Sequence, residues 1–309
     1  MKTRIFAALV LAFLTIFSGY ARESYAFVQR DTTLYLDVYQ PAAPANGYTV
    51  VFIFGGGFLK GSRLGQWNVN YCTLLAERGY TAVAIDYRLG LKGKGHIGIS
   101  NVEVLENAFY MAAEDCSAAI AYLVLHADEL HIDPAKIILC GSSAGAVTAL
   151  MTDYGRCNHM PYTRELPAGW KPAGVVSFSG AIYSTLRGLK WAETPAPTML
   201  WHGTVDKLVT YRKIVFGRRG FYGADPIAKQ LEKNNFAYCI VRCRNLGHEV
   251  CMFGPKSLSE LDDFVQRFIA QPRPLHIDIT LRDDSIQPTI YTTISVKQVY
   301  KQKLLDNPQ

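Results

Sequence analysis

Residues 136–145 read KIILCGSSAG, and this stretch decides the fold that we expect for the chain. Residues 137–139 form a short, continuous apolar run, which is typical of a central parallel strand covered on both faces. Residues 144–152, AGAVTALMT, follow as a predicted helix. A strand that turns into a helix through Gly-x-Ser-x-Gly places the serine in a tight turn, where larger neighbours than glycine would clash. The pattern predicts a nucleophile elbow with Ser143 at its tip.

Two alternatives to this interpretation exist at the motif itself. Gly-x-Ser-x-Gly also arises by accident in loops rich in glycine and serine, so the strand and helix around it carry the argument. Ser142 is a weaker candidate than Ser143, because Cys140 and not a glycine lies two residues before it. The helix predicted after Ser143 would point its unpaired N–H groups at the same spot, where they can stabilise negative charge on a bound carbonyl oxygen.

The composition of the chain fits a globular protein with a large core. Of its 309 residues 49% are hydrophobic and 19% are charged, so nothing in the composition favours disorder. The formal net charge of +6 is mild, and no basic stripe interleaved with aromatic residues points to nucleic acid. The densest basic cluster lies within residues 212–219, and we interpret it as a solvated loop.

The first 21 residues have the order of a secretory signal. Lys2 and Arg4 precede an apolar run at residues 5–17, and residues 18–21, SGYA, follow in small-x-small order. The run is too short to span a bilayer comfortably. We expect cleavage after Ala21, with Ala26 as an alternative site, and a secreted or periplasmic protein with no stable membrane span. An uncleaved membrane anchor is the competing interpretation.

The cysteines and the known short motifs argue against a metal or a cofactor. Seven cysteines are an odd number for an exported protein, so at least one is unpaired within the chain. Their spacing suits neither a disulfide framework nor a zinc site, and Cys239 and Cys243 lie too far apart on one predicted strand to bridge each other. Neither His-Glu-x-x-His nor Gly-x-Gly-x-x-Gly occurs, so we expect no cofactor.

Strand-like and helix-like stretches alternate along most of the chain. The predicted strands are residues 33–39, which alternate and are expected at an edge of the sheet, and residues 49–54, 81–85, 137–139, 174–178, 198–201 and 238–242. The predicted helices between and after them include residues 71–78, a long amphipathic stretch containing residues 109–123, residues 226–233 and residues 257–270. This alternation predicts an α/β fold with a mostly parallel sheet and helices on both faces, in one catalytic domain spanning residues 22–271.

The ends and insertions of this domain carry two further expectations. The insertions at residues 90–106 and 153–172 are short, so no large cap domain is expected. In the C-terminal extension, residues 272–309, two alternating stretches at 275–281 and 289–296 flank a polar turn. That pattern predicts an appended β-hairpin.

A serine hydroxyl needs a histidine base, and the histidine needs a carboxylate that fixes its tautomer. Asp206 follows the strand at 198–201, and His248 follows the strand at 238–242. Because the carboxyl ends of parallel strands meet at one edge of a sheet, Ser143, Asp206 and His248 can converge there. Residues 55–57 are three consecutive glycines directly after another strand, where backbone N–H groups can come close to a ligand.

With these motifs in place, the chain resembles the α/β-hydrolase family, and within it bacterial acetyl and feruloyl esterases with an HGGG-type loop. The resemblance covers residues 34–270. Its motifs are FGGGF at 54–58, DYRL at 86–89, GSSAG at 141–145, HGTVD at 202–206 and GHE at 247–249. One departure is Phe54, which stands where the family usually has histidine before the three glycines.

The resemblance implies a role for each matched position. Ser143 would be the nucleophile, Asp206 the acid and His248 the base. The N–H groups of the remaining positions would form the oxyanion hole; these are Gly56, Gly57 and Ala144. Three further expectations are secondary: His202 braces the acid loop, Glu249 is a substitute acid, and a structural polar brace consists of Asp86, Arg88 and Asp115.

The resulting prediction is an exported serine carboxylesterase that removes short acyl groups, of acetyl or feruloyl type, from carbohydrate or similar esters. Its partner would be a small-molecule or carbohydrate ester, and the oligomeric state stays open. Two alternatives remain. One is a serine peptidase of the prolyl-oligopeptidase type, and the other is a hydrolase-fold protein that binds a partner without catalysis.

Overall fold

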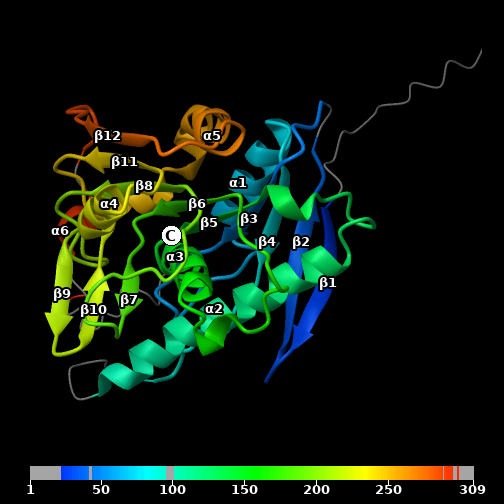
Figure 1. Ribbon diagram of the computed structural model, residues 1–309, viewed down its shortest axis with the longest axis horizontal. Helices are drawn as coiled ribbons and strands as arrows, with labels where there is room; N and C mark the ends of the chain where they lie inside the picture. Colours follow the sequence, from blue (N-terminus) through cyan, green and yellow to red (C-terminus); the bar gives the residue numbers. More distant parts are fainter. Residues whose placement is uncertain (1–21, 42–43, 95–100, 288, 295–297, 299–309) are drawn as a thin grey trace, which may run out of the picture.

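The computed structural model describes residues 22–41, 44–94, 101–287, 289–294 and 298 (Figure 1). The predicted signal at residues 1–21 lies outside these ranges. In the described part of the chain, nine strands form one sheet in the order β1-β2-β4-β3-β5-β6-β8-β11-β12. The strands are β1 (Arg22–Gln29), β2 (Thr33–Tyr39), β3 (Thr49–Ile53), β4 (Thr81–Ile85), β5 (Ile137–Ser142), β6 (Gly174–Phe178), β8 (Thr198–Gly203), β11 (Tyr238–Cys243) and β12 (His276–Leu281).

The sheet is mostly parallel, as the alternation of strands and helices predicted. Only β1 and β2 run antiparallel to their neighbours, whereas β4, β3, β5, β6, β8, β11 and β12 pair in parallel. The helices are α1 (Gln66–Glu77), α2 (Val102–Leu125), α3 (Ala144–Cys157), α4 (Ala224–Lys233), α5 (Leu258–Phe264) and α6 (Ile290–Thr293). Helices α1 and α5 cover one face of the sheet, and α2 and α3 cover the other (Figure 1).

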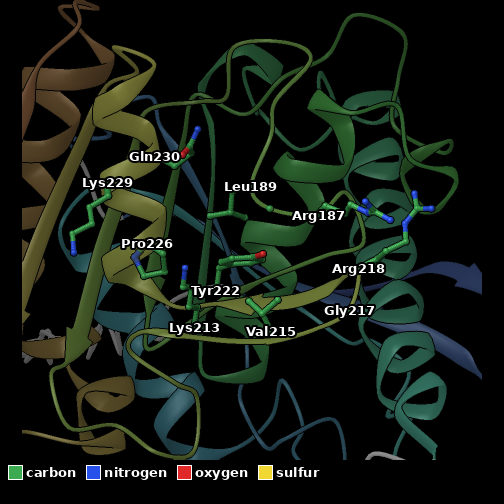
Figure 2. Close-up of a pocket in the computed structure, with 11 residues that line it drawn as sticks. Arg187, Leu189, Lys213, Val215, Gly217, Arg218, Tyr222, Pro226, Lys229 and Gln230 are labelled. Carbon is green, nitrogen blue, oxygen red and sulfur yellow. The ribbon is translucent and has the colours of Figure 1, made fainter.

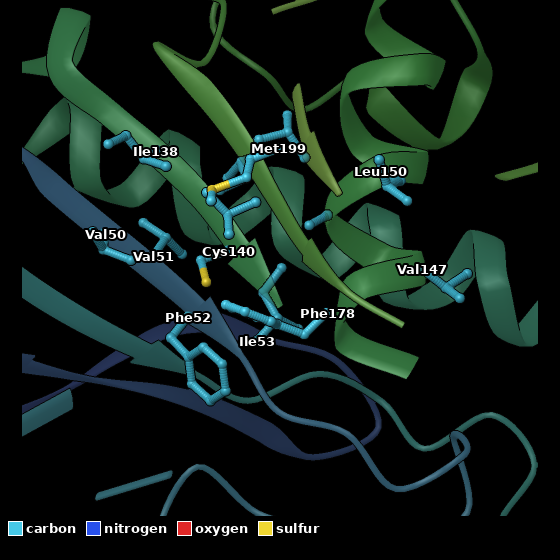
Figure 3. Packing of buried hydrophobic residues seen from close by; sticks show 14 of the residues in the cluster. Val50, Val51, Phe52, Ile53, Ile138, Cys140, Val147, Leu150, Phe178 and Met199 are labelled. Atoms are coloured by element: carbon cyan, nitrogen blue, oxygen red, sulfur yellow. The ribbon is translucent and has the colours of Figure 1, made fainter. Parts of the chain in front are cut away.

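The core lies between the central strands and these helices. Every residue of β3, β4 and β5 is buried, which explains why these strands are continuous apolar runs and do not alternate. Figure 3 shows side chains of β3, β5, β6 and β8 packed together with Val147 and Leu150 of α3. Cys140 is among them as a small buried side chain, as expected.

All seven cysteines are free thiols, and six of them are buried. Burial raises the pKa of the Cys140 and Cys116 thiols to about 12, so these side chains behave as apolar filling and not as nucleophiles.

Helix α2 is long and apolar enough, by length and hydropathy alone, to cross a membrane. Sixty-one per cent of its apolar window is buried in this fold, where α2 packs against α3 as a core helix. Its buried Asp115 receives a hydrogen bond from the Arg88 backbone N–H at 2.8 Å. The apolar face of α2 is therefore explained by the core of the protein.

Two predictions at the edges of the sheet were wrong. Residues 33–39 do not form an edge strand, because β1 pairs outside them through an antiparallel ladder from Arg22 to Gln29. In the described part of the C-terminal extension the predicted hairpin does not form either: β12 pairs in parallel with β11 and extends the main sheet. The second half of the expected hairpin contains α6, and residues 295–297 lie outside the described ranges.

The sequence around α6 explains why a helix replaces the expected strand. The Thr289 side chain accepts a hydrogen bond from the Tyr291 N–H at 3.1 Å, and the Thr292 hydroxyl accepts one from the Thr289 N–H at 2.8 Å. This reciprocal pair is a capping box, which starts a helix even where the apolar pattern alternates.

A second, three-stranded sheet interrupts the main alternation. Strands β7 (Ile182–Ser184), β9 (Lys213–Phe216) and β10 (Arg219–Tyr222) pair antiparallel in the order β7-β10-β9. The β9–β10 hairpin is inserted between β8 and α4, and Figure 1 shows it projecting beside the N-terminal half of α2. These short strands escaped the sequence analysis, which interpreted the basic cluster in this region as a solvated loop.

Candidate active site

The turn between β5 and α3 has the geometry of a nucleophile elbow. Ser143 has φ 53° and ψ −117°, a conformation that a residue with a side chain rarely adopts. A Cβ atom on Gly141 would lie 2.2 Å from the Gly145 carbonyl oxygen, and one on Gly145 would lie 1.9 Å from the Ile53 carbonyl oxygen. Both positions therefore require glycine. The structure supports the reason given from the sequence for the Gly-x-Ser-x-Gly spacing.

The structure brings together the three side chains that the sequence singled out. Ser143 Oγ lies 2.8 Å from Nε2 of His248, and Nδ1 of the same ring lies 2.8 Å from Oδ2 of Asp206. All three side chains are buried. His248 opens the short helix η4 (His248–Met252) after β11, and Asp206 lies in the loop after β8. The three loops meet at the carboxyl edge of the sheet, as expected for parallel strands.

The carboxylate of Asp206 is held in place from both sides. Its Oδ1 accepts hydrogen bonds from the backbone N–H groups of Leu208 at 2.9 Å and Val209 at 3.0 Å. Burial alone would raise the pKa of Asp206. The hydrogen bonds that it accepts from His202 and His248 outweigh burial and hold this pKa well below its ordinary value. The group is therefore a fixed anion that can orient an imidazole and stabilise its charged form.

His202 has the bracing position expected for it. Its Nε2 lies 2.9 Å from the Val209 carbonyl oxygen and 3.4 Å from Asp206 Oδ2. Because the carbonyl can only accept, this nitrogen carries the proton. Glu249, the alternative acid, points elsewhere: its Oε1 accepts a hydrogen bond from the Thr292 hydroxyl at 2.8 Å. The carboxylate that contacts His248 is that of Asp206.

Ser142 is occupied structurally. Its hydroxyl donates to the Cys251 carbonyl oxygen at 2.8 Å and so ties the end of β5 to helix η4. This contact separates the two adjacent serines, since Ser143 faces His248 and Ser142 faces the backbone of η4.

The three glycines after β3 lie against the elbow. A Cβ on Gly55 would lie 3.2 Å from the Ser143 Cβ. Gly56 and Gly57 have φ values of 122° and 64°, and the Gly56 carbonyl accepts hydrogen bonds from Leu59 and Lys60. Within the described part of the chain, the N–H groups of these two glycines have no hydrogen-bond acceptor.

Ala144 is the first residue of α3, where helix geometry leaves the N–H groups without a partner inside the helix. The N–H groups of Gly56, Gly57 and Ala144 are thus the donors that an oxyanion hole beside Ser143 would use.

Tyr87 is a residue of this site that the sequence analysis missed. Its hydroxyl donates to the Phe54 carbonyl oxygen at 3.0 Å, and its ring stacks on the Phe54 ring with centroids 4.5 Å apart. Its ring also packs edge-on against the Phe58 ring, with centroids 6.0 Å apart. Tyr87 therefore touches both ends of the glycine loop. The DYRL motif marks the segment that contains Tyr87, but the contact itself is with a backbone carbonyl, which no sequence pattern indicates.

Those charged residues form the polar brace that the resemblance implied. Arg88 Nε lies 2.9 Å from Asp115 Oδ2, and Arg30 Nε lies 3.3 Å from Asp115 Oδ1. Asp86 pairs with Arg63. The brace fixes the segment after β4 that also carries Tyr87.

Helix α6 reaches the site from the C-terminal extension. A Cβ on Gly247 would lie 2.4 Å from the Thr292 carbonyl oxygen, so α6 packs directly against the residue before His248. The hydrogen bond from Thr292 to Glu249 adds a second contact on the other side of His248.

Among the described residues, no group of three or more His, Cys, Asp or Glu side chains is arranged to hold a metal ion.

Comparison with known proteins places this geometry in a class. The chain has the α/β-hydrolase fold, and the structure of a Thermogutta terrifontis esterase with butyrate bound matches it with a TM-score of 0.60. That match has 22% identity and covers 82% of this chain and 96% of the esterase. The apo form of Thermogutta terrifontis esterase 2 matches with a TM-score of 0.57, also at 22% identity, over 83% of this chain and 97% of that one.

Sequence relatives narrow the class. Residues 36–181 match the BD-FAE family model. Lipase 2 of Moraxella sp. is 31% identical over 33% of this chain and 20% of its own length. Acetyl esterase of Salmonella paratyphi B is 31% identical over 37% of this chain and 30% of its own length. The neuroligin-like protein glit-1 of Caenorhabditis elegans is 29% identical over 55% of this chain and 22% of its own length.

These matches span less than a third of those curated proteins. The predicted fold and the predicted resemblance to serine carboxylesterases of the α/β-hydrolase class are confirmed.

Proposed function

We propose that this chain is a serine carboxylic-ester hydrolase. The observation that carries the proposal is the hydrogen-bonded series Ser143–His248–Asp206, with 2.8 Å between each pair of atoms, at the tip of a strained elbow. His248 Nε2 accepts the proton of Ser143 as its oxygen attacks the ester carbonyl. The same nitrogen then gives that proton to the leaving alcohol. Water, deprotonated in the same way, releases the acyl group from the serine and restores the enzyme.

The backbone N–H donors around the elbow would stabilise the negatively charged intermediate of this reaction. As the carbonyl oxygen becomes negative, the N–H groups of Gly56, Gly57 and Ala144 would donate to it from fixed positions. Donors placed in advance lower the barrier because no reorganisation is needed during the reaction.

For the substrate we propose short acyl groups, of acetyl or feruloyl type, on a carbohydrate or similar alcohol. Two observations support this choice. Residues 36–181 match the BD-FAE model, and acetyl esterases of Salmonella are among the relatives. The Thermogutta terrifontis esterase, which has a related fold, was solved with butyrate bound, and butyrate is also a short acyl group.

We further propose that the chain is exported after cleavage behind Ala21. Strand β1 begins at Arg22, and Arg22 already pairs with Tyr39 of β2. Cleavage behind Ala21 keeps every described residue of β1, whereas cleavage behind Ala26 would remove five of them. N-terminal sequencing of the secreted protein tests this choice.

Hydrolysis of p-nitrophenyl acetate, butyrate and octanoate, and of acetylated xylan, tests the reaction. We expect Ser143→Ala to lower kcat at least about 10³-fold. The matched control is Ser142→Ala, which removes the neighbouring hydroxyl and one backbone hydrogen bond, and should keep kcat within about tenfold. Equal rates for the wild type and Ser143→Ala would show that Ser143 is not the nucleophile. Cleavage of peptides but not esters would favour the peptidase alternative, and inactivity on both would favour a binding protein.

A further inference from the structure

A basic hairpin follows the acid loop and plays no part in the proposed reaction. Residues 207–223 contain five cationic side chains and no carboxylate. The cationic residues are Lys207, Arg212, Lys213, Arg218 and Arg219. Most of this stretch is the β9–β10 hairpin. A charge imbalance of this kind needs an explanation, because like charges on one short segment repel each other.

A groove of about 680 Å³ lies between this hairpin, the loop after β7 and helix α4 (Figure 2). Four cationic side chains line it. Figure 2 shows Arg187 and Arg218 toward one end and Lys213 and Lys229 toward the other. No carboxylate is among the lining residues. The volume is in the range of sites that hold a small organic ligand, and it exceeds what one inorganic anion fills.

Three of the four charges have no partner of opposite sign. Within the described residues, the side chains of Arg187, Lys213 and Arg218 make no ion pair and no hydrogen bond. Lys229 pairs with Asp225 at 2.9 Å, and Asp225 also forms an ion pair with Arg242. Outside the groove, Arg219 pairs with both Glu103 and Glu106, whereas Lys207 and Arg212 make no ion pair within the described residues. The groove therefore carries three cations whose charge no described side chain neutralises.

The loop that carries Arg187 is held in a strained conformation. Arg187 has φ 55°, in the left-handed region that costs a residue with a side chain about 1–2 kcal/mol. The Ser184 hydroxyl donates to the Gly188 carbonyl at 2.7 Å and accepts from the Leu186 N–H at 3.2 Å. Buried Tyr154 lies 2.9 Å from the same hydroxyl. These contacts hold the backbone that carries the unpaired Arg187 at the rim, and such retained strain is typical of functional sites.

We propose that this groove binds an anionic oligosaccharide, with its carboxylate or sulfate groups on the two clusters of cations. Between the clusters the groove offers neutral hydrogen-bonding groups, the Tyr222 hydroxyl and the Gln230 amide, and apolar surface from Leu189 and Pro226. This mixture suits a sugar chain, which carries hydroxyl groups and apolar ring faces between its charged groups.

Two other anionic partners fit less well. Single-stranded nucleic acid needs exposed aromatic rings for its bases, and the one aromatic residue that lines the groove, Tyr222, is 7% exposed. A membrane surface would need several large, exposed apolar side chains beside the cations, but among the apolar residues that line the groove Leu189 is buried and Val215 is the large one that is exposed. The exposed Ile214 and Phe216 point to the opposite face of β9 from Lys213 and Val215, because side chains alternate along a strand.

The hairpin that lines the groove is connected to the loop that carries Asp206. Strand β9 begins seven residues after Asp206, and a Cβ on Gly223 at the end of the hairpin would lie 1.8 Å from the Thr210 carbonyl oxygen. The hairpin is therefore packed on the acid loop. A chain bound here would contact the hairpin that follows the acid loop, and this binding does not depend on the proposed reaction.

Calorimetric titration of the full chain carrying Ser143→Ala tests the proposal without any hydrolysis. The probes are tetragalacturonate, a sulfated oligosaccharide of similar length, neutral xylotetraose, a short oligothymidylate and phosphatidylglycerol vesicles. We expect binding of one or both anionic sugars, weaker at higher salt, and none of the neutral sugar. Whichever anionic sugar binds more tightly identifies carboxylate or sulfate as the group that is recognised.

The variant Arg187→Gln/Arg218→Gln should bind the anionic sugar at least about tenfold more weakly, because charge-assisted hydrogen bonds are lost. Lys213→Gln is a second, independent variant that should also weaken binding. The matched control is Lys171→Gln/Arg273→Gln, which removes two exposed cations at the amino edge of the sheet and should change affinity less than about twofold.

Several results would overturn the proposal. These are no binding of either anionic sugar, equal binding of xylotetraose, an affinity that the groove variants leave unchanged, or an equal loss in the control. Tighter binding of oligothymidylate or of vesicles, lost in the groove variants, would assign the groove to nucleic acid or to membrane instead.

Discussion

The hydroxyl of Tyr87 donates a hydrogen bond to the carbonyl oxygen of Phe54, 3.0 Å away, directly before the three glycines. The two rings also stack, and a Cβ on Gly61 would lie 2.6 Å from the Phe54 ring. The loop that lacks the usual histidine is therefore held by a buried tyrosine from the segment after β4. This contact explains how the glycine loop keeps its position with phenylalanine at its first residue.

Tyr87→Phe should lower kcat about threefold to tenfold with little change in KM, because one hydrogen bond that fixes the oxyanion donors is lost. Steady-state kinetics on p-nitrophenyl acetate measures this. Tyr80→Phe is the matched control, since it removes a hydroxyl bonded to Asp262 at 2.7 Å. The role assigned to Tyr87 fails if both variants have the wild-type kcat.

Ser143→Gly should be more stable than Ser143→Ala by about 1–2 kcal/mol, because glycine adopts a φ of 53° without strain. Both variants lack the hydroxyl, so the comparison isolates the backbone. Urea denaturation of the two proteins gives the difference. At an ordinary helix position alanine is the more stabilising residue, and that order here would show that the elbow is not strained.

Gly56→Ala should destabilise the protein more than Gly57→Ala. A Cβ on Gly56 would lie 1.9 Å from the Lys60 carbonyl oxygen, whereas one on Gly57 meets only Leu59 Cδ1 at 3.9 Å. Both variants are destabilised by an alanine at a positive φ, and the clash at Gly56 adds about 1–3 kcal/mol to the loss of unfolding free energy. Thermal denaturation, with kcat measured in parallel, distinguishes them, and equal losses would contradict this account of the loop.

The stability contributed by Asp206 should disappear in acid. Its folded pKa lies below the value of about 3.9 for an unfolded aspartate, so the unfolded state binds more protons as the pH falls. The contribution is complete above about pH 5 and is lost progressively below about pH 4. We therefore expect the gap in unfolding free energy between wild type and Asp206→Asn to narrow in acid.

Buried Asp115 and Asp153 have pKa values raised by burial and contribute with the opposite sign, so only the difference between the two proteins is informative. Urea unfolding from pH 3 to 7 measures it, and a gap independent of pH would contradict the prediction.

Thr292→Val should lower both stability and kcat. It removes the hydroxyl that donates to Glu249 and that accepts from the Thr289 N–H, leaving a buried carboxylate oxygen without a partner next to His248. A lost hydrogen bond to a charged group costs about 1.5–3 kcal/mol. The control is Thr293→Val on the exposed side of α6. If the two variants behave alike, α6 does not support the histidine.

Much of the site could be predicted because its residues obey local rules. Gly141 and Gly145 are required by contacts within one turn, so the spacing around Ser143 identifies the elbow. Asp206 and His248 follow strands that the sequence shows as clear apolar runs. Because these strands pair in parallel, the loops after them lie at the same edge of the sheet.

Two features that the sequence did not predict, helix α6 and the contact of Tyr87, both depend on contacts between segments far apart in the chain. The alternation at residues 289–296 suits a strand, but the side chains of Thr289 and Thr292 cap a helix instead, and packing on Gly247 holds it. Tyr87 was overlooked because its partner is a backbone carbonyl, which leaves no mark in a sequence pattern.

The sequence by itself determined the parallel α/β fold, the elbow and the order of the serine, the acid and the base. Those features follow from periodicity and from glycines that tolerate no side chain. Only the tertiary structure decided the bracing by Tyr87, the docking of α6 beside His248 and the groove lined by Arg187 and Lys213. Each of these depends on which distant segments pack together, and packing depends on the shape of the whole core and not on any local pattern.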